Sequence, residues 1–338
     1  MPANAGSRND FIDCLRGALI FMTLWGHAIQ YIGYGGDVTR YYDDPIFKAF
    51  YMFHMPLFML LSGYLSQHSM AGADWAGYLR KRFRQILLPA ICWPLLALSL
   101  VLIWQLCQQP AAGWQGVSDT VRHFRPGLWF LWALFGSTLV VAILKKFKLD
   151  RLEYFALATA LFLLAPDGAC IYLFKYTFPF FCLGYALAGQ GQIRLPARVP
   201  WTVWVFLCAA VAAGYFLWNV DTYIYTTRMR LAGNWHNVLL RWLINGLASA
   251  LFTLVAFTIY RYKKSPLLAE WGRRSLDIYI IQDFLLKGLM TYAGPWKNSI
   301  AFSLLAAPAY AAGLCFAACL IGSGIRQIPV MKTLLLGK

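Results

Sequence analysis

FIDCLRGALIFMTLWGHAIQYIGY, residues Phe11–Tyr34, is an apolar stretch of membrane-spanning length that contains Arg16 and His27. Ionisable side chains are costly to bury in a bilayer, so their presence in such a stretch indicates a functional site. The spacing of eleven residues is close to three helical turns, which places both side chains on nearly the same face, about 16 Å apart along the axis. Asp13 lies one turn before Arg16 near that face and is expected to pair with it. We therefore predict that one face of this helix carries all three groups.

The composition is that of a polytopic membrane protein. Of the 338 residues, 60% are hydrophobic and 13% are charged, and apolar runs near the ~20 residues needed to cross a bilayer recur along the chain. The net charge of +16 comes from short basic clusters between these runs, which favours a topology signal over a nucleic-acid surface. We expect one all-α transmembrane domain over residues 1–338, with no appended soluble domain and no cleaved signal peptide.

The cysteines show neither CxxC pairs nor the cysteine and histidine spacing of metal sites. They are interpreted as small buried apolar side chains, so we expect no metal. The eight are Cys14, Cys92, Cys107, Cys170, Cys182, Cys208, Cys315 and Cys319.

About ten spans are predicted, and basic residues cluster in alternate connections between them. By the positive-inside rule these connections are cytoplasmic, and so are both termini. The other connections are poorer in basic residues and include Asp37, Asp119 and Asp221. The predicted spans are Phe11–Tyr34, Phe47–Gln67, Ile86–Cys107, Gly127–Leu144, Glu153–Ala165, Ala169–Gly189, Trp201–Val220, Val238–Tyr260, Ser275–Tyr292 and Ser299–Ile321. The basic residues of the cytoplasmic connections are Arg80, Lys81, Arg82, Arg84, Lys145, Lys146, Lys148, Arg151, Arg194, Arg198, Arg261, Lys263, Lys264, Arg273 and Arg274.

This orientation assigns a depth to the polar residues of the first spans. Arg16 falls near the cytoplasmic edge, at the level of Arg80–Arg84, whereas His27 falls in the outer third of the membrane. His54 lies at a similar depth, because the second span runs in the opposite direction. The sequence therefore predicts a cationic inner mouth and a histidine-bearing outer chamber.

Three further polar residues are candidates for the outer chamber. Lys175 and Arg241 lie a turn or two from the outer ends of their helices, and Asn245 follows Arg241 by four residues on the same face. Contact with a substrate and a structural pair between helices are equally good interpretations of these residues.

Structural interpretations exist for the other candidates as well. Arg16 could anchor the helix end at the interface, and His27 could be a hydrogen-bonded structural histidine. Arg80–Arg84 could set topology or bind anionic lipid. His54 suits packing as well as a site, and Ser62, followed by Gly63, suits close helix packing better than nucleophilic attack.

Several short stretches of the sequence resemble the motifs of a known family. They are Asp13-Cys-Leu-Arg16-Gly17, Gly26-His27-Ala28, FHMPLFMLLSGYL from Phe53 to Leu65, RKRFRQILLP from Arg80 to Pro89, and LWFLWALF from Leu128 to Phe135. Together they closely resemble the membrane-bound acyltransferase 3 family, and the strings at Tyr176–Tyr185 and Trp271–Leu286 are similar to its later helices. The GHA and FHMPLF motifs and the short length of the chain most resemble the fucose 4-O-acetylase subgroup of this family.

The resemblance implies transfer of an acyl group, usually acetyl, from cytoplasmic acyl-CoA to a hydroxyl of an extracytoplasmic or lipid-linked sugar or polysaccharide. It implies that His27 is the catalytic histidine, that Arg16 is its partner, and that the basic residues before the third helix bind the donor. The family's Arg-x-x-Arg spacing is held here by Lys81 and Arg84, with Arg80 and Arg82 also available. A histidine is common in the family where this chain has Gln282–Asp283.

The chemistry of the residues agrees with this reaction. Histidine titrates near neutrality, so His27 is predicted to take the proton of the sugar hydroxyl as the hydroxyl attacks the thioester, without an acyl-enzyme. We predict His27, Arg16 and Asp13 as the catalytic group. The CoA phosphates are assigned to Arg16, Lys81, Arg82 and Arg84, and the acceptor to His54, Lys175, Arg241 and Asn245.

Two other function classes compete with an enzyme. A transporter or flippase for an anionic or lipid-linked substrate would also use inner cations, but no matched pair of broken helices is evident. A structural scaffold has no reason to bury four ionisable side chains in its first two spans. We expect a multi-pass protein of the inner (plasma) membrane in contact with lipid, with a homo-oligomer as an open option.

Overall fold

The computed structural model describes residues 9–108, 116, 118, 120, 121, 127–168, 171–191, 198–224, 229, 231, 233–289 and 299–338. Within these ranges the chain is helical and contains no strand, which confirms the all-α prediction. The helices used below are α1 (Asp10–His27), η1 (Ala28–Gly33), α2 (Val38–Tyr41), α3 (Pro45–Tyr51), α4 (His54–Met70), α5 (Trp75–Arg82), η2 (Phe83–Leu87), α6 (Leu88–Gln108), α8 (Trp129–Lys146), α9 (Leu152–Leu164), α10 (Ile171–Gly189), α11 (Trp201–Leu217), η4 (Val220–Thr222), α12 (Trp235–Tyr262), α13 (Pro266–Arg273), α14 (Ser275–Leu289), η6 (Phe302–Ala306), α15 (Ala307–Ile325) and α16 (Pro329–Leu336).

Seven helical segments in the described part of the chain are long and apolar enough to cross a membrane. Three of the ten predicted spans correspond to shorter helices: α9 has 13 residues, α11 has 17 and α14 has 15. Residues 290–292 of one predicted span lie outside the described residues, as do Cys170, Arg194 and Asp119. The count of ten and the cytoplasmic location of both termini stay predictions.

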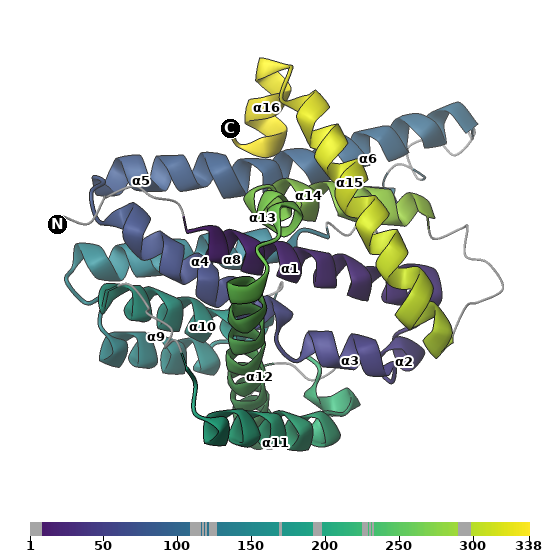
Figure 1. Cartoon of the computed structure of the whole chain (residues 1–338). Coiled ribbons are helices and arrows are strands. Elements are labelled where there is room, and N and C mark those ends of the chain that lie inside the picture. The colour runs from purple at the N-terminus through teal and green to yellow at the C-terminus, as the bar shows by residue number, and fades with distance from the viewer. Residues whose placement is uncertain are drawn as a thin grey trace.

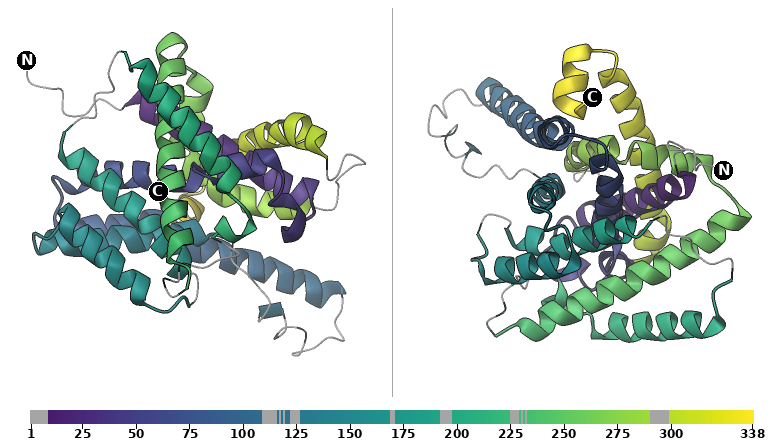
Figure 2. Two further views of the ribbon diagram at one scale, coloured as in Figure 1. Left: turned by 90° about the horizontal axis from the view of Figure 1, so that it is seen from below. Right: turned by 90° about the vertical axis from the view of Figure 1, so that its left-hand side faces the viewer.

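Helix α1 runs through the middle of the bundle, with α13, α14 and α15 packed against it and α11 at the far edge (Figure 1). Its apolar side chains Leu15, Leu19 and Leu24 are at most 2% exposed. In contrast, the second half of α6 projects away from the bundle, as both views in Figure 2 show, and Leu100 and Trp104 on it are exposed. The helix that carries Arg16 and His27 is therefore enclosed by protein.

Glycines let α1 approach α13 closely. A methyl group on Gly17 would lie 1.8 Å from the carbonyl oxygen of Leu268, and one on Gly272 would lie 1.8 Å from that of Asp13. No side chain fits at either position, because the two backbones touch there. This contact fixes the start of α14, which follows α13 after Arg274.

A second close contact joins α4 and α10. A methyl group on Gly63 would lie 1.9 Å from the carbonyl oxygen of Phe181, and one on Gly184 would lie 1.9 Å from that of Leu60. The packing interpretation of Gly63 agrees with this geometry. Ser62, its neighbour, donates a hydrogen bond to the Phe58 carbonyl at 2.8 Å.

We predict that Gly63→Ala destabilises the protein by about 1–3 kcal/mol, because the added methyl must push two packed helices apart. The measurement is thermal unfolding of purified protein in detergent. Gly246→Ala is the matched control, since no atom lies within 4 Å of its methyl position on α12. Equal melting temperatures for the two variants would contradict the close α4–α10 contact.

Candidate active site

His27 occupies the point at which α1 ends and the π-helical segment η1 begins. Short π-helical segments of this kind are frequent at functional sites. The Nδ1 atom of His27 lies 3.0 Å from Oε1 of Gln282 on α14, and the ring centroid of Tyr31 lies 5.9 Å from that of His27. A helix from the far end of the sequence therefore holds the imidazole.

A cavity of about 260 Å³, called the His27 cavity below, opens beside this imidazole. It combines the aromatic rings of Tyr31, Tyr51 and Trp129 with polar groups such as the Asp283 carboxylate. Among described residues its lining consists of Thr23, His27, Gln30, Tyr31, Tyr51, His54, Met55, Gly127, Trp129, Tyr279 and Asp283. Aromatic faces beside hydrogen-bonding groups suit a small polar ligand with apolar ring faces.

A smaller pocket of about 50 Å³ lies further toward the start of α1 and is called the Arg16 pocket. Arg16 donates a hydrogen bond from Nη2 to the Ser275 hydroxyl at 2.8 Å. Thr23, Met55 and Tyr279 line both this pocket and the His27 cavity. The two spaces therefore follow one another along α1 and are separated by these three side chains.

Asp13 is buried on α1, 4% exposed, and its carbonyl faces Gly272. An ion pair between Asp13 and Arg16 stays a prediction.

The wall of the His27 cavity formed by α3 is fixed by the buried carboxylate of Asp44. Its Oδ1 atom accepts hydrogen bonds from the backbone N–H groups of Ile46 and Phe47 at 3.0 and 2.9 Å. Its Oδ2 atom accepts from the hydroxyls of Tyr34 at 3.2 Å and Ser303 at 2.5 Å.

Two further hydrogen bonds link Gln30 to the same wall. Its Nε2 atom donates to the Tyr41 hydroxyl at 3.1 Å, and its Oε1 atom accepts from the Tyr51 hydroxyl at 3.4 Å. The aromatic side of the cavity is therefore held in place before any ligand binds.

His54 starts α4 and lines the same cavity as His27. Its Nδ1 atom lies 2.8 Å from the Phe50 carbonyl, an acceptor, so Nδ1 carries the proton. The Tyr51 ring packs edge-on against it at 4.6 Å between centroids. The structure thus brings both imidazoles to one space, and the role of His54 in acceptor binding stays a prediction.

Besides Arg16, three basic residues are predicted to bind the donor, and they lie at the end of α5 and in η2. Lys81 and Arg84 are exposed, and Arg82 donates from Nε to the Tyr78 hydroxyl at 3.2 Å. Arg84 donates from Nη2 to the Thr333 hydroxyl at 3.1 Å and to the Lys338 carbonyl at 3.2 Å. They are not among the described residues that line the Arg16 pocket, so donor binding by them stays a prediction.

Lys175 forms a buried ion pair. Its Nζ atom lies 2.7 Å from Oδ1 of Asp167 and also donates to the Ala165 carbonyl, and both charged side chains are at most 1% exposed. This arrangement ties α10 to the segment before it, which agrees with the structural interpretation.

Asn245 supplies a hydrogen-bond donor in place of the N–H group that a proline lacks. Pro56 has no N–H group, so the Met52 carbonyl, four residues earlier, lacks its helical donor. The side-chain amide of Asn245 on α12 donates to that carbonyl instead. Asn245 therefore supports the junction of α3 and α4, from which Tyr51 and His54 enter the cavity.

Arg241, one turn before Asn245, is completely buried and supports the segment at η4. It donates from Nε to the Thr222 carbonyl at 2.6 Å. Lys175, Arg241 and Asn245 are absent from the described lining of the His27 cavity, so their role as acceptor contacts stays a prediction.

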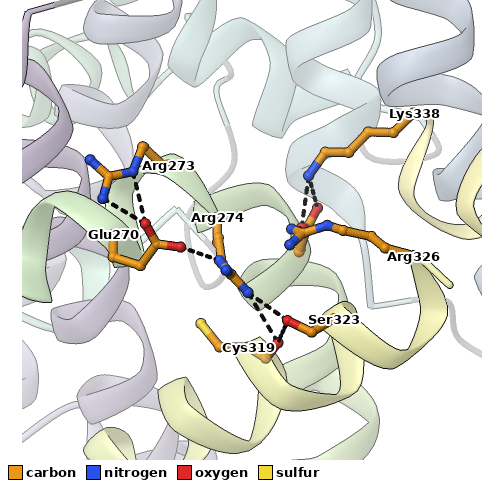
Figure 3. Close-up of polar contacts among 8 residues, drawn as sticks. Glu270, Arg273, Arg274, Cys319, Ser323, Arg326 and Lys338 are labelled. Carbon is orange, nitrogen blue, oxygen red and sulfur yellow. Dashed lines mark hydrogen bonds and ion pairs between the residues drawn. The ribbon is translucent and has the colours of Figure 1, made fainter.

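An ion-pair network joins α13 to α15 (Figure 3). Glu270 accepts hydrogen bonds from Arg273 at 2.6 and 2.8 Å and from Arg274, whose Nη1 atom donates to the Ser323 hydroxyl at 2.7 Å. The Arg273 hydrogen bonds hold the pKa of Glu270 below its ordinary value, so this network is lost only as the pH falls through that lowered pKa.

The two aspartates of α14 have different surroundings. Asp277 binds Lys338 at 2.8 Å and Arg326, whereas Asp283 lines the His27 cavity. The two carboxylates therefore serve different parts of the protein.

Sequence reasoning missed several residues of this site. Gln282 was noted only as a departure from the usual histidine, yet it binds His27. Ser275, the partner of Arg16, begins α14 directly after Arg274. In the described residues no group of three or more histidine, cysteine, aspartate or glutamate side chains is placed to hold a metal ion, and the seven cysteines there are free thiols.

Comparison with known proteins identifies the family of this chain. A family model described as an acyltransferase domain, that of the acyltransferase 3 family, matches residues 9–324. The chain belongs to the acyltransferase 3 family. This acyltransferase is 30% identical over 311 residues to nodulation protein NolL of Sinorhizobium fredii, which covers 88% of this chain and 83% of the relative. It is 28% identical over 312 residues to nodulation protein NolL of Mesorhizobium japonicum, covering 88% and 82%. No solved structure matches the acyltransferase.

We predict that Asn245→Ala lowers the melting temperature, because the Met52 carbonyl loses its donor, at a cost of about 1–3 kcal/mol. The folded fraction should keep its KM for the acceptor. Asn237→Ala, at the first turn of α12, is the control. A raised acceptor KM at unchanged melting temperature would instead make Asn245 a substrate contact.

Proposed function

We propose that this acyltransferase moves an acetyl group from acetyl-CoA on the cytoplasmic side to a sugar hydroxyl on the outer side of the inner (plasma) membrane. The observation that carries the proposal is the succession of two spaces along α1, with Arg16 in the smaller and His27 in the larger. An anion-binding group and a base about 16 Å apart suit a donor whose phosphates and thioester lie far apart.

The reaction needs a base at the acceptor, because an alcohol is a weak nucleophile. His27 accepts the hydroxyl proton while the oxygen attacks the thioester carbonyl. The new carbon–oxygen bond forms, the carbon–sulfur bond breaks, and the proton passes from His27 to the departing thiolate. Since Ser62 points back to the Phe58 carbonyl, no acyl-enzyme is invoked.

The donor phosphates are assigned to cations near the start of α1. Arg16 has the position for this role, because it lines the pocket that leads to His27. Lys81, Arg82 and Arg84 lie on the helix that follows α4, where their charge favours phosphate. Arg84 would exchange its hydrogen bonds to Thr333 and Lys338 for a phosphate oxygen.

The lining of the His27 cavity supports a sugar as the acceptor. Tyr31, Tyr51 and Trp129 offer faces on which a sugar ring stacks, and Gln30 and Asp283 offer groups that bind its hydroxyls. A sugar, polysaccharide or lipid-linked glycan of the kind that the fucose 4-O-acetylase subgroup modifies fits this combination. The protein then works as a multi-pass enzyme in contact with lipid, as a monomer or a homo-oligomer.

The first test replaces the proposed base. His27→Ala should lower the rate of acetyl transfer from labelled acetyl-CoA to glycan by about 10²–10⁴-fold, the usual contribution of a general base. The assay uses purified protein in lipid vesicles. His68→Ala, at an exposed histidine on α4, serves as the control. Transfer at the normal rate by His27→Ala would exclude His27 as the base.

The second test concerns the donor. Arg16→Ala should weaken CoA binding by about 10–100-fold, because a charge-assisted hydrogen bond contributes about 1.5–3 kcal/mol. Calorimetry on purified protein measures it. Arg151→Ala, whose exposed side chain pairs with Glu153, should leave CoA affinity unchanged. Unchanged affinity in Arg16→Ala would remove Arg16 from the donor site.

A further inference from the structure

Gln282 is a buried amide whose two ends have different partners. Its side chain belongs to a residue that is 2% exposed on α14. Its Nε2 atom donates to the Tyr279 carbonyl at 3.3 Å, one turn earlier on the same helix. Its Oε1 atom lies 3.0 Å from Nδ1 of His27. Because the NH₂ end already faces a carbonyl, the oxygen end faces the histidine.

This orientation determines which nitrogen of His27 carries the proton. An amide oxygen only accepts hydrogen bonds, so Nδ1 must donate. A neutral imidazole has a single N–H group, which leaves the lone pair on Nε2, at the opposite side of the ring. His27 lines the His27 cavity, and in the proposed function Nε2 is the nitrogen that takes the proton of the acceptor.

The helix that presents Gln282 is firmly packed. Ile278 and Ile281 on the same helix are at most 2% exposed, and the Ser275 hydroxyl at its start accepts from Arg16. The amide is also uncharged, unlike the carboxylate that often orients a catalytic histidine. It can orient the ring without forming an ion pair that would hold the proton on the imidazole.

We infer that Gln282 is the positioning residue of this enzyme: it holds His27 in the Nδ1–H tautomer and so keeps Nε2 available to accept the proton of the sugar hydroxyl. This inference rests on the proposed function, in which His27 is the base. Gln282 acts through His27 and is assigned no contact with either substrate.

The test compares two replacements of similar size in the full-length protein. Gln282→Met keeps the volume and removes the acceptor, so kcat for acetyl transfer should fall about 100-fold as the ring loses its orientation. Gln282→Glu keeps an acceptor for Nδ1–H, so kcat should stay well above that of Gln282→Met, but below the wild type because the carboxylate can hold the proton on the imidazole. Both variants should keep KM for acetyl-CoA and for the glycan within about twofold, because neither substrate contacts this side chain. Gln327→Met, at an exposed glutamine after α15, is the control.

Spectroscopy gives a readout that loss of packing alone would not produce. The side-chain nitrogen-15 signals of His27, assigned by difference from His27→Ala, should report a proton on Nδ1 in the wild type. In Gln282→Met the proton should redistribute to Nε2. Calorimetric CoA binding to each variant checks that the protein is folded.

Several results would overturn the inference. They are a wild-type proton on Nε2, an unchanged tautomer in Gln282→Met, or a kcat for that variant within about twofold of the wild type. If His27→Ala abolishes transfer while Gln282→Met does not, the proposed function stands and the inference fails. If the wild type transfers no acetyl group, the proposed function fails, and the tautomer measurement still decides the role of Gln282.

Discussion

The backbone contact between α1 and α13 determines where the reactive side chains lie. Gly17 and Gly272 bring the two helices together so closely that no side chain fits between them. Arg16 precedes one glycine and Ser275 follows the other by three residues, so their hydrogen bond is a direct consequence of the crossing. Helix α14 then continues along α1 and reaches His27 two turns later with Gln282. A single steric constraint thus sets both ends of the proposed reaction path.

Local sequence properties predicted the parts of the site that belong to one helix. The apolar run of residues 11–34 and the spacing of Arg16 and His27 are properties of one segment of the chain, and both side chains line spaces that follow one another along α1. The placement of His54 beside His27 in one cavity agrees with a depth argument that needed only the direction of the second span. The all-α class likewise followed from apolar runs separated by charged connections.

The other parts of the site depend on which helices pack against each other. The positions of the spans in the sequence do not show which helices are neighbours. Arg241 and Asn245 were placed at a suitable depth, but α12 turns them toward the backbones of Thr222 and Met52. Pro56 was a usable signal for Asn245, because a proline in a membrane helix leaves a carbonyl that another group must satisfy. For Gln282 the signal was that a side chain able both to donate and to accept hydrogen bonds stands where the family often has a histidine, which can also do both. For Lys175 the sequence left substrate contact and a structural pair open, and its partner Asp167 lies in the connection before α10.

The three side chains between the Arg16 pocket and the His27 cavity have a consequence for the permeability of the membrane. An enzyme that accepts one substrate from each side must avoid becoming a proton channel, and a continuous file of water along α1 would conduct protons. The Arg16 pocket, at about 50 Å³, leaves room for very few water molecules beside Thr23, Met55 and Tyr279. The Met55 side chain is unbranched and flexible, so it can rotate aside for the narrow arm of the proposed donor and then return. In the proposed reaction, passage of the donor arm and exclusion of ions would therefore depend on the same three side chains.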